Sequence, residues 1–193
     1  RPHQELLREL YGCDIALFPA HLTTLNLAAR QITDEENFPL IRRGNFFEVA
    51  DTPHSFCTVP GRRHQETGER TRQPVPLPQL DAVVGNPPYV RQENIDRQSQ
   101  LKKRRNETVE SFASRRKNSK EFFSDLVNRM WPGLKLSGRS DLHCYFWPTS
   151  AKFLKDGGYF GFLTSSSWLD VEYGFALQKW ILKHFRLIAI LES

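Results

Sequence analysis

The most informative stretch of this chain is Asp81-Ala82-Val83-Val84-Gly85, which runs directly into Asn86-Pro87-Pro88-Tyr89. The apolar run predicts a short buried strand. The prolines must end it, because they lack an N–H and fix φ near −65°. Proline forces the preceding residue to be extended, so we expect an extended Asn86 at the strand's carboxyl end, where α/β sheets bind ligands. A polar amide, a free Pro87 carbonyl and the Tyr89 ring suit a planar base that carries an exocyclic amine.

Composition indicates a globular domain. The chain has 193 residues, of which 39% are hydrophobic, enough for a sizeable core. No apolar run reaches the roughly 18–20 residues that span a bilayer, and the N-terminus lacks a signal-peptide core, so we expect a cytoplasmic protein with no membrane partner. The three scattered cysteines predict reduced thiols, and the six histidines show no ligand spacing, so no metal is expected. Since the chain starts at Arg1 rather than Met, we expect a piece of a larger polypeptide.

Positive charge is concentrated in one block. Residues 97–120 hold nine Lys or Arg and two Asp or Glu, whereas the rest of the chain is close to neutral. A basic block on a neutral body predicts a polyanionic partner, and a solvated loop is an equally good interpretation. The candidate nucleic-acid-binding residues are Arg91, Lys102, Lys103, Arg104, Arg105, Arg115, Arg116 and Lys117.

Hydrophobic periodicity predicts strands that alternate with helices. The expected strands are 10–15, 40–42, 81–85, 159–164 and 187–191, and the expected helices are 17–30, 121–130, 141–155 and 171–185. This alternation predicts an α/β fold with a mostly parallel sheet and helices on both faces. Residues 48–79 and 90–140 show little periodicity and predict long loops or insertions. Asp156-Gly157-Gly158 is expected to end the 141–155 helix.

Four further segments accompany residues 81–93 in a characteristic order: 11–15, 41–46, 141–146 and 158–169. In this order the chain resembles the S-adenosylmethionine-dependent adenine-specific (N6) DNA methyltransferases of restriction-modification systems, most closely the large type IIG-like enzymes. The resemblance implies a partial catalytic domain over residues 1–193, with a Rossmann-like class I sheet. It also implies that the glycine-rich cofactor loop and first strand precede Arg1, that a target-recognition domain is absent, and that the cell is bacterial or archaeal.

The resemblance also implies roles for individual residues. The catalytic candidates are Asn86, Pro87, Pro88 and Tyr89. The candidates for binding S-adenosylmethionine are Asp14, Ile15, Asn45, Phe46 and Asp141, with Asn45 standing where the family usually has Asp. Asp14 and Asp141 have an alternative as helix N-caps, Ile15 and Phe46 as core residues. Ser165 and Ser166 are expected to line the base pocket or to form a polar turn.

The expected chemistry is methyl transfer to adenine in duplex DNA. The Asn86 side-chain oxygen and the Pro87 carbonyl would accept hydrogen bonds from the amine, and Tyr89 would stack on the flipped base. The alternative is a purely structural role, in which residues 86–89 form a proline-rich turn with a capping asparagine. An RNA base or a protein glutamine is an alternative acceptor, and a non-catalytic nucleic-acid-binding remnant or subunit is a further alternative.

Overall fold

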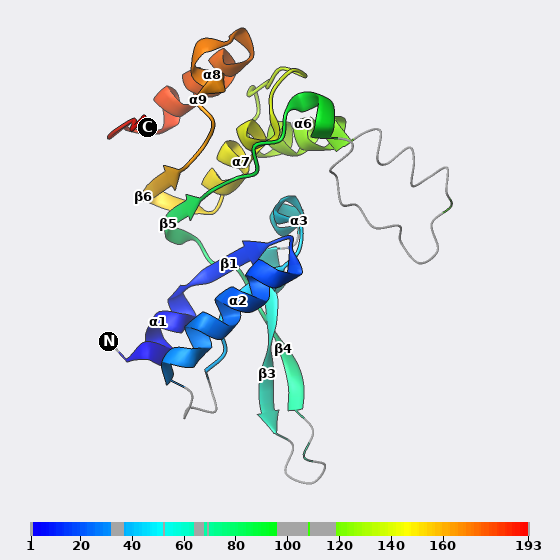
Figure 1. Ribbon diagram of the computed structural model, residues 1–193, viewed down its shortest axis with the longest axis vertical. Helices are drawn as coiled ribbons and strands as arrows, with labels where there is room; N and C mark the ends of the chain where they lie inside the picture. The colour runs from blue at the N-terminus through cyan, green and yellow to red at the C-terminus, as the bar shows by residue number, and fades with distance from the viewer. Residues whose placement is uncertain are drawn as a thin grey trace. The chain divides into compact units, whose positions relative to one another are not determined.

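The computed structural model describes residues 2–31, 37–51, 53–63, 68, 70–95, 108 and 119–192. It divides into two compact units, Arg1–Gln79 and Leu80–Ser193, which are described one at a time (Figure 1). Within the described ranges, no helix is long and apolar enough to cross a membrane. The same ranges hold no group of three or more His, Cys, Asp or Glu side chains that could hold a metal ion.

The N-terminal unit is built on a parallel strand pair. Its elements are α1 (His3–Glu9), β1 (Tyr11–Asp14), α2 (Leu17–Ala28), η1 (Ala29–Gln31), β2 (Leu40–Arg43), α3 (Phe46–Asp51), η2 (Pro53–Ser55), β3 (Cys57–Arg63) and β4 (Arg70–Val75). Strands β1 and β2 pair in parallel from Tyr11↔Leu40 to Asp14↔Arg43. A parallel pair needs a crossover, and α2 supplies it while packing against both strands (Figure 1). The strands and helix predicted here from sequence are confirmed.

Strands β3 and β4 form an antiparallel hairpin within residues 48–79, which the sequence predicted as a long loop. Hydrophobic periodicity misses this hairpin because five of the six β4 positions are exposed, so no inward face alternates with an outward one. Pro60 and Pro74 also argued against strands, but a two-stranded sheet consists of edges, where proline is tolerated. Arg42 holds the base of the hairpin by donating from Nη1 to the carbonyls of Ser55 and Phe56, each at 3.1 Å.

The C-terminal unit contains a second parallel pair. Its elements are β5 (Leu80–Gly85), η3 (Gln92–Asn94), α6 (Ser119–Met130), α7 (Leu142–Ala151), β6 (Leu154–Phe162), α8 (Ser167–Asp170), η4 (Glu172–Gly174) and α9 (Phe175–His184). Strands β5 and β6 run parallel, with Ala82↔Tyr159 to Gly85↔Phe162 in register. Helix α7 packs against α6 and β6 (Figure 1). The architecture is therefore mixed α/β with parallel pairs, as predicted, while the described strands do not join into one complete sheet.

An aromatic cluster holds α7 to β6 and α8. The Trp147 ring stacks on Phe160 at 5.0 Å and lies 5.2 Å from the Phe162 ring and 5.7 Å from the Trp168 ring. Two residues earlier in α7, Tyr145 is fully buried against Phe123 of α6. These rings bury large apolar areas, so the positions of α7 and of the segment after β6 are fixed by the same core.

The predicted end of the 141–155 helix is wrong. Helix α7 ends at Ala151, and residues 154–162 form β6, so Asp156-Gly157-Gly158 lies inside a strand. Gly157 has φ +77°, and the pairing register shifts between Leu80 and Ala82 at this point. The left-handed glycine therefore serves a strand irregularity instead of a helix cap, two uses that the sequence alone cannot separate.

Two predictions about strands near the ends of the unit also fail. Val84 of β5 is 82% exposed, so β5 is not the fully buried strand that its apolar run predicted. Residues 187–191 form no strand, and Ile188 and Leu191 are 78% and 93% exposed. An apolar run becomes a buried strand only where neighbouring strands and covering helices are present. Among the described residues, β5 has β6 as its one neighbouring strand, and residues 187–191 pair with no strand.

The close approach of Gly174 to α8 gives a stability test. A Cβ at Gly174 would overlap the carbonyl oxygen of Trp168, which is backbone and also accepts from Gln178 Nε2 at 2.9 Å. We predict that Gly174→Ala lowers the free energy of unfolding by about 1–3 kcal/mol. Gly138→Ala is the matched control, because nothing lies within 4 Å of its Cβ position. Equal Tm values for the Gly174 and Gly138 variants of the full-length protein would contradict this packing.

Candidate active site

The strongest candidate site lies at the carboxyl edge of the β5–β6 pair. Gly85 and Phe162 are register partners, and the N–H of Leu163 donates to the carbonyl of Gly85 at 3.0 Å. Because the strands are parallel, the loop that starts at Asn86 and the turn that starts at Leu163 leave the sheet side by side. This is the edge at which α/β proteins place their ligands.

The loop after β5 presents an amide and an aromatic ring to solvent. Asn86 is exposed and the Tyr89 side chain is 55% exposed. Pro87 is buried, and Val90, also buried, donates its N–H to the carbonyl of Pro88 at 2.9 Å. No described residue donates to the Asn86 side chain or to the Pro87 carbonyl. Among the described residues the Pro87 carbonyl thus has no hydrogen-bond donor, and Pro87 as a whole is less accessible than Asn86.

Two hydrogen bonds tie this loop to the start of α7. The N–H of Leu142 donates to the carbonyl of Val90 at 3.0 Å, and the N–H of Gln92 donates to Asp141 Oδ1 at 3.0 Å. These residues are about fifty positions apart in the sequence. The four-residue motif is consequently held at both ends, by β6 before Asn86 and by α7 after Tyr89.

The Asp141 carboxylate is engaged by two partners in the structure. Its second oxygen, Oδ2, accepts from the Tyr173 hydroxyl at 3.0 Å. Asp141 occupies the N-cap position of α7 but its side chain makes no capping hydrogen bond, so the N-cap alternative fails for the carboxylate. What the geometry shows is a bridge from the segment that follows Asn86–Tyr89 to η4. A contact between Asp141 and the cofactor stays a prediction.

Tyr173 is a site residue that sequence reasoning missed. Its hydroxyl lies 3.2 Å from Ser167 Oγ, and Ser167 Oγ lies 3.0 Å from Ser165 Oγ. Burial raises the pKa of Tyr173, and the neighbouring Asp141 carboxylate raises it further against the opposing hydrogen bond from Ser167. The phenol therefore stays protonated at neutral pH. The sequence placed Tyr173 inside a long helix, and only the three-dimensional turn after α8 brings it to Asp141.

His143 is the buried neighbour of this network. It is 1% exposed, and neither ring nitrogen has a hydrogen-bond partner among the described residues. Burial lowers the pKa of His143, outweighing the opposing effect of Asp141. Burial likewise raises the pKa of the adjacent Cys144 thiol to about 12, so Cys144 is an inert core thiol.

The N-terminal unit brings four predicted cofactor residues together. Asp14 is the last residue of β1 and Asn45 lies two residues after β2, and the N–H of Gly44 donates to the Asp14 carbonyl at 2.9 Å. Asp14 Oδ1 accepts from the N–H of Ala16 at 2.7 Å, and Ala16, not Asp14, is the N-cap of α2. Asn45 Oδ1 accepts from the N–H of Phe47 at 3.1 Å. The N-cap alternative for Asp14 is therefore wrong.

The two apolar cofactor candidates in this unit differ in exposure. Ile15 is 42% exposed, and Phe46 is half-buried with its ring 6.1 Å from the Phe47 ring. Ile15 is thus not a core residue, whereas Phe46 retains both interpretations. Their roles remain predictions.

Of the predicted basic residues, Arg91 is described and is exposed. The remaining seven lie outside the described residues: Lys102, Lys103, Arg104, Arg105, Arg115, Arg116 and Lys117.

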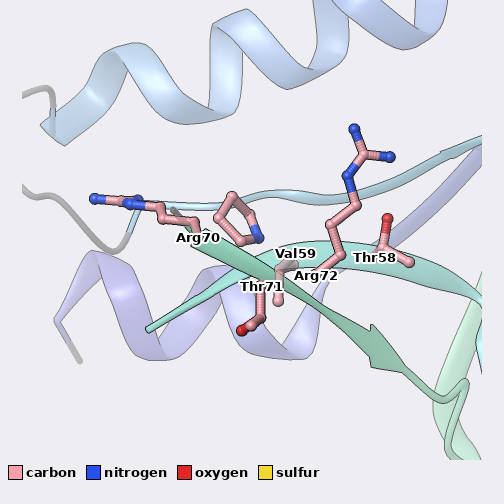
Figure 2. Close-up of a pocket in the computed structure, with 6 residues that line it drawn as sticks. Thr58, Val59, Arg70, Thr71 and Arg72 are labelled. Carbon is pink, nitrogen blue, oxygen red and sulfur yellow. The ribbon is translucent and has the colours of Figure 1, made fainter. Parts of the chain in front are cut away.

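The hairpin adds a basic surface that was not predicted. Thr58, Val59, Pro60, Arg70, Thr71 and Arg72 line an open groove of about 420 Å³ on strands β3 and β4. Arg72 and Thr58 project to one side of the hairpin and Thr71 to the other (Figure 2). The Arg70 guanidinium lies 6.0 Å from the centre of the Phe38 ring. Exposed arginines beside threonine hydroxyls form a surface that suits phosphate groups.

Two comparisons with known proteins relate the chain to restriction-modification enzymes. A family model described as Eco57I restriction-modification methylase matches residues 8–193. The chain is also similar to the Type II methyltransferase M.XamI of Xanthomonas campestris pv. amaranthicola, with 29% identity over 115 residues. That alignment covers 60% of this chain and 18% of the length of M.XamI.

The buried imidazole predicts a pH dependence of stability. Because the folded pKa of His143 is below its ordinary value of 6.5, the unfolded chain takes up a proton first as the pH falls. The contribution of neutral His143 is complete above pH 6.5 and is lost as the pH drops toward the lowered folded pKa. This contribution to the free energy of unfolding amounts to about 1.4 kcal/mol for each unit by which folding lowers the pKa of His143. Denaturant titrations of the full-length protein at pH 7.5 and 5.5 should show a larger fall for the wild type than for His143→Gln. Equal falls would refute this origin.

Proposed function

Because the chain belongs to the Eco57I restriction-modification methylase family, we propose that it transfers a methyl group from S-adenosylmethionine to the exocyclic N6 amine of adenine in duplex DNA. The observation that carries the proposal is the Asn86–Tyr89 loop, whose amide and aromatic ring are exposed at the carboxyl end of β5. The loop is tied to β6 and α7, so its exposed groups are presented from a braced frame. Adenine carries an exocyclic amine on a planar ring, which this amide and this aromatic ring would fit together.

The chemistry asked of Asn86 is electrostatic. The lone pair of the adenine amine is delocalised into the ring, which makes the nitrogen a poor nucleophile. An acceptor oxygen aimed at an amine hydrogen localises that pair on nitrogen, and preorganised groups of this kind contribute about 3–4 kcal/mol each. The Pro87 carbonyl would act as the second acceptor once the loop opens. Tyr89 would stack on the flipped base, contributing roughly 1–3 kcal/mol.

The residues at the ends of β1 and β2 fit the adenosine part of the cofactor. One Asp14 oxygen is used by the Ala16 N–H, and the other has no hydrogen-bond partner among the described residues, so it is available to ribose hydroxyls. Ile15, which is exposed beside it, offers an apolar face for the adenine ring, and Phe46 would offer a second. Asn45 would assist as an acceptor. When bound, the cofactor supplies an electrophilic methyl group on a sulfonium.

Exposed apolar side chains support a larger Rossmann-like sheet with helices on both faces. Phe18 and Leu25 of α2 are 75% and 65% exposed, and Val84 of β5 is 82% exposed. Phe18 and Leu25 are seven positions apart and therefore lie on one face of α2, and soluble proteins rarely leave a large apolar patch uncovered. We propose that other parts of a longer polypeptide cover these positions and complete the sheet.

The hairpin groove supports a contact with the duplex backbone. Arg70 and Arg72 are exposed, occur at alternate positions of β4 and therefore lie on one face of the strand (Figure 2). Phosphate contacts of this kind supply affinity and register and carry no sequence information. Arg91, exposed just after the catalytic loop, would add a contact near the base.

Substitution of Asn86 tests the catalytic proposal. We expect Asn86→Ala to lower kcat for methyl transfer by about 100-fold to 1,000-fold, because one preorganised acceptor is lost. DNA affinity should change little, since the phosphate contacts remain. Labelled S-adenosylmethionine, unmethylated phage DNA and the full-length protein are the reagents, with N6-methyladenine quantified by mass spectrometry. Asn128→Ala, an exposed asparagine on α6, is the control and should retain full activity.

Three outcomes would contradict the proposal. Methylation found on cytosine would exclude the amine of adenine as the acceptor. Label incorporated only into RNA or into a protein glutamine would favour the alternative substrates. A wild-type protein that binds DNA and transfers no methyl group would identify a non-catalytic subunit.

Charge reversal tests the hairpin contact. We predict that the double variant Arg70→Glu/Arg72→Glu weakens DNA binding and reduces the slope of log K against log salt by about 2, since two cationic contacts are lost. Filter binding or fluorescence anisotropy across a salt series measures this slope. Lys179→Glu/Lys183→Glu on α9 makes the same change of net charge at exposed positions and is the control. Identical slopes for the two double variants would overturn the contact.

A further inference from the structure

We propose that Asp141 and Tyr173 are positioning residues for methyl transfer, which together brace the catalytic loop against the turn that follows β6. This inference rests on the proposed function, because the braced loop is the one assigned to the adenine. Neither residue is required to touch substrate or cofactor in this role. The role is to fix where the exposed amide of Asn86 points.

The need for a brace follows from the loop itself. The Asn86 side chain has no hydrogen-bond partner among the described residues, so its orientation depends on the backbone on either side. Before Asn86, the backbone is held by the Gly85 carbonyl, which accepts from Leu163 at 3.0 Å. After Tyr89, it is held by Val90 and Gln92, and the Gln92 bond ends on the Asp141 carboxylate at 3.0 Å. The carboxylate is thus one of two anchors on that side.

Proton counting gives the network a defined direction. A hydroxyl carries one proton, and the strongest acceptor within reach of Tyr173 is the Asp141 carboxylate, at 3.0 Å. Tyr173 therefore donates to Asp141 and accepts from Ser167 across 3.2 Å. Ser165 in turn donates to Ser167 across 3.0 Å, and the N–H of Ser167 donates back to Ser165 at 3.3 Å. Each of the three hydroxyl groups thus donates its one proton, and this series of hydrogen bonds ends on the Asp141 carboxylate.

The chain links the two segments that leave the sheet side by side. Gln92 belongs to the continuation of the catalytic loop, and Ser165 belongs to the turn after β6. These segments form the two walls of the proposed base site at the carboxyl edge of β5 and β6. Bonds between them are made through Asp141, the N-cap residue of α7, and Tyr173 of η4. Loss of the bridge would let the walls shift relative to each other, and misplacement by about 1 Å costs as much as 100-fold in rate.

The same proton counting predicts which substitution is tolerated. In Asp141→Asn, the amide oxygen still accepts from Gln92 and the amide nitrogen donates to Tyr173. Tyr173 then donates to Ser167 and Ser167 to Ser165, so the chain survives with its direction reversed. In Asp141→Ala, both ends of the bridge are lost. A positioning role thus predicts rescue by asparagine, whereas a need for the negative charge does not.

The test compares kcat and KM for methyl transfer by full-length variants, with labelled S-adenosylmethionine and unmethylated phage DNA. We expect Asp141→Ala to lower kcat by roughly 30-fold to 100-fold, Tyr173→Phe by roughly 10-fold, and Asp141→Asn by less than about 3-fold. The KM values for DNA and cofactor should stay within about twofold of wild type. The double variant Asp141→Ala/Tyr173→Phe should be no slower than Asp141→Ala alone, because both changes break one bridge. Tyr159→Phe removes a hydroxyl from a tyrosine that is 69% exposed, and is the matched control.

Different outcomes overturn different statements. An inactive wild type would remove the proposed function and leave the bridge as a structural feature. An active wild type with unchanged kcat in Tyr173→Phe and Asp141→Ala would overturn the positioning role, even if their Tm values fell. Equal losses in Asp141→Asn and Asp141→Ala would assign the effect to charge instead of geometry. A rise in the KM for cofactor with kcat unchanged would place Asp141 at the cofactor, as the family resemblance implies.

Discussion

The parallel pairing of β5 with β6 is the constraint on which the candidate site depends. Parallel strands end at the same edge, so the bond from Leu163 N–H to the Gly85 carbonyl places two loops with distant sequence positions next to each other. Parallel strands also require a long crossover, and here that crossover carries α7 and the Asp141 carboxylate back to the loop that preceded it. The parallel topology therefore places the turn after β6 beside the Asn86–Tyr89 loop. Its crossover also supplies the Asp141 carboxylate that holds the continuation of this loop.

The two prolines of the motif do only part of the work of shaping the loop. They fix φ at positions 87 and 88 and stop β5, which is local and readable from the sequence. They do not fix the direction in which the exposed Asn86 side chain points, because that depends on the backbone at both flanks. Hydrogen bonds donated by the N–H groups of Leu163, Leu142 and Gln92 fix the backbone position on both sides of the motif. Local stiffness and distant anchoring are complementary here, since a stiff loop without anchors would still rotate as a body.

The sequence predicted what depends on local chemistry and missed what depends on neighbours. Prolines and apolar runs correctly predicted strands β1, β2, β5 and most of β6, their parallel direction, and the motif at a carboxyl end. The hairpin over residues 57–75 was missed because exposed strands have no apolar alternation to read. Gly157 was assigned to a helix end because a left-handed glycine suits both a helix cap and a strand irregularity. The bridge through Tyr173 could not be predicted, since no spacing rule connects residues 92, 141 and 173.

The burial of Pro87 beside an exposed Asn86 and Tyr89 has a mechanistic consequence. Under the proposed function, a base stacked on Tyr89 would meet the exposed Asn86 amide first, and the carbonyl of the buried Pro87 would be engaged only after the loop adjusts. If both acceptors must engage for the amine to become nucleophilic, the second contact is made late, after the base has been captured. The motion cannot involve the whole loop, because its flanks are bonded to β6 and α7. It would therefore be confined to the residues between Gly85 and Val90, which are the residues that the proposed function assigns to the reacting base.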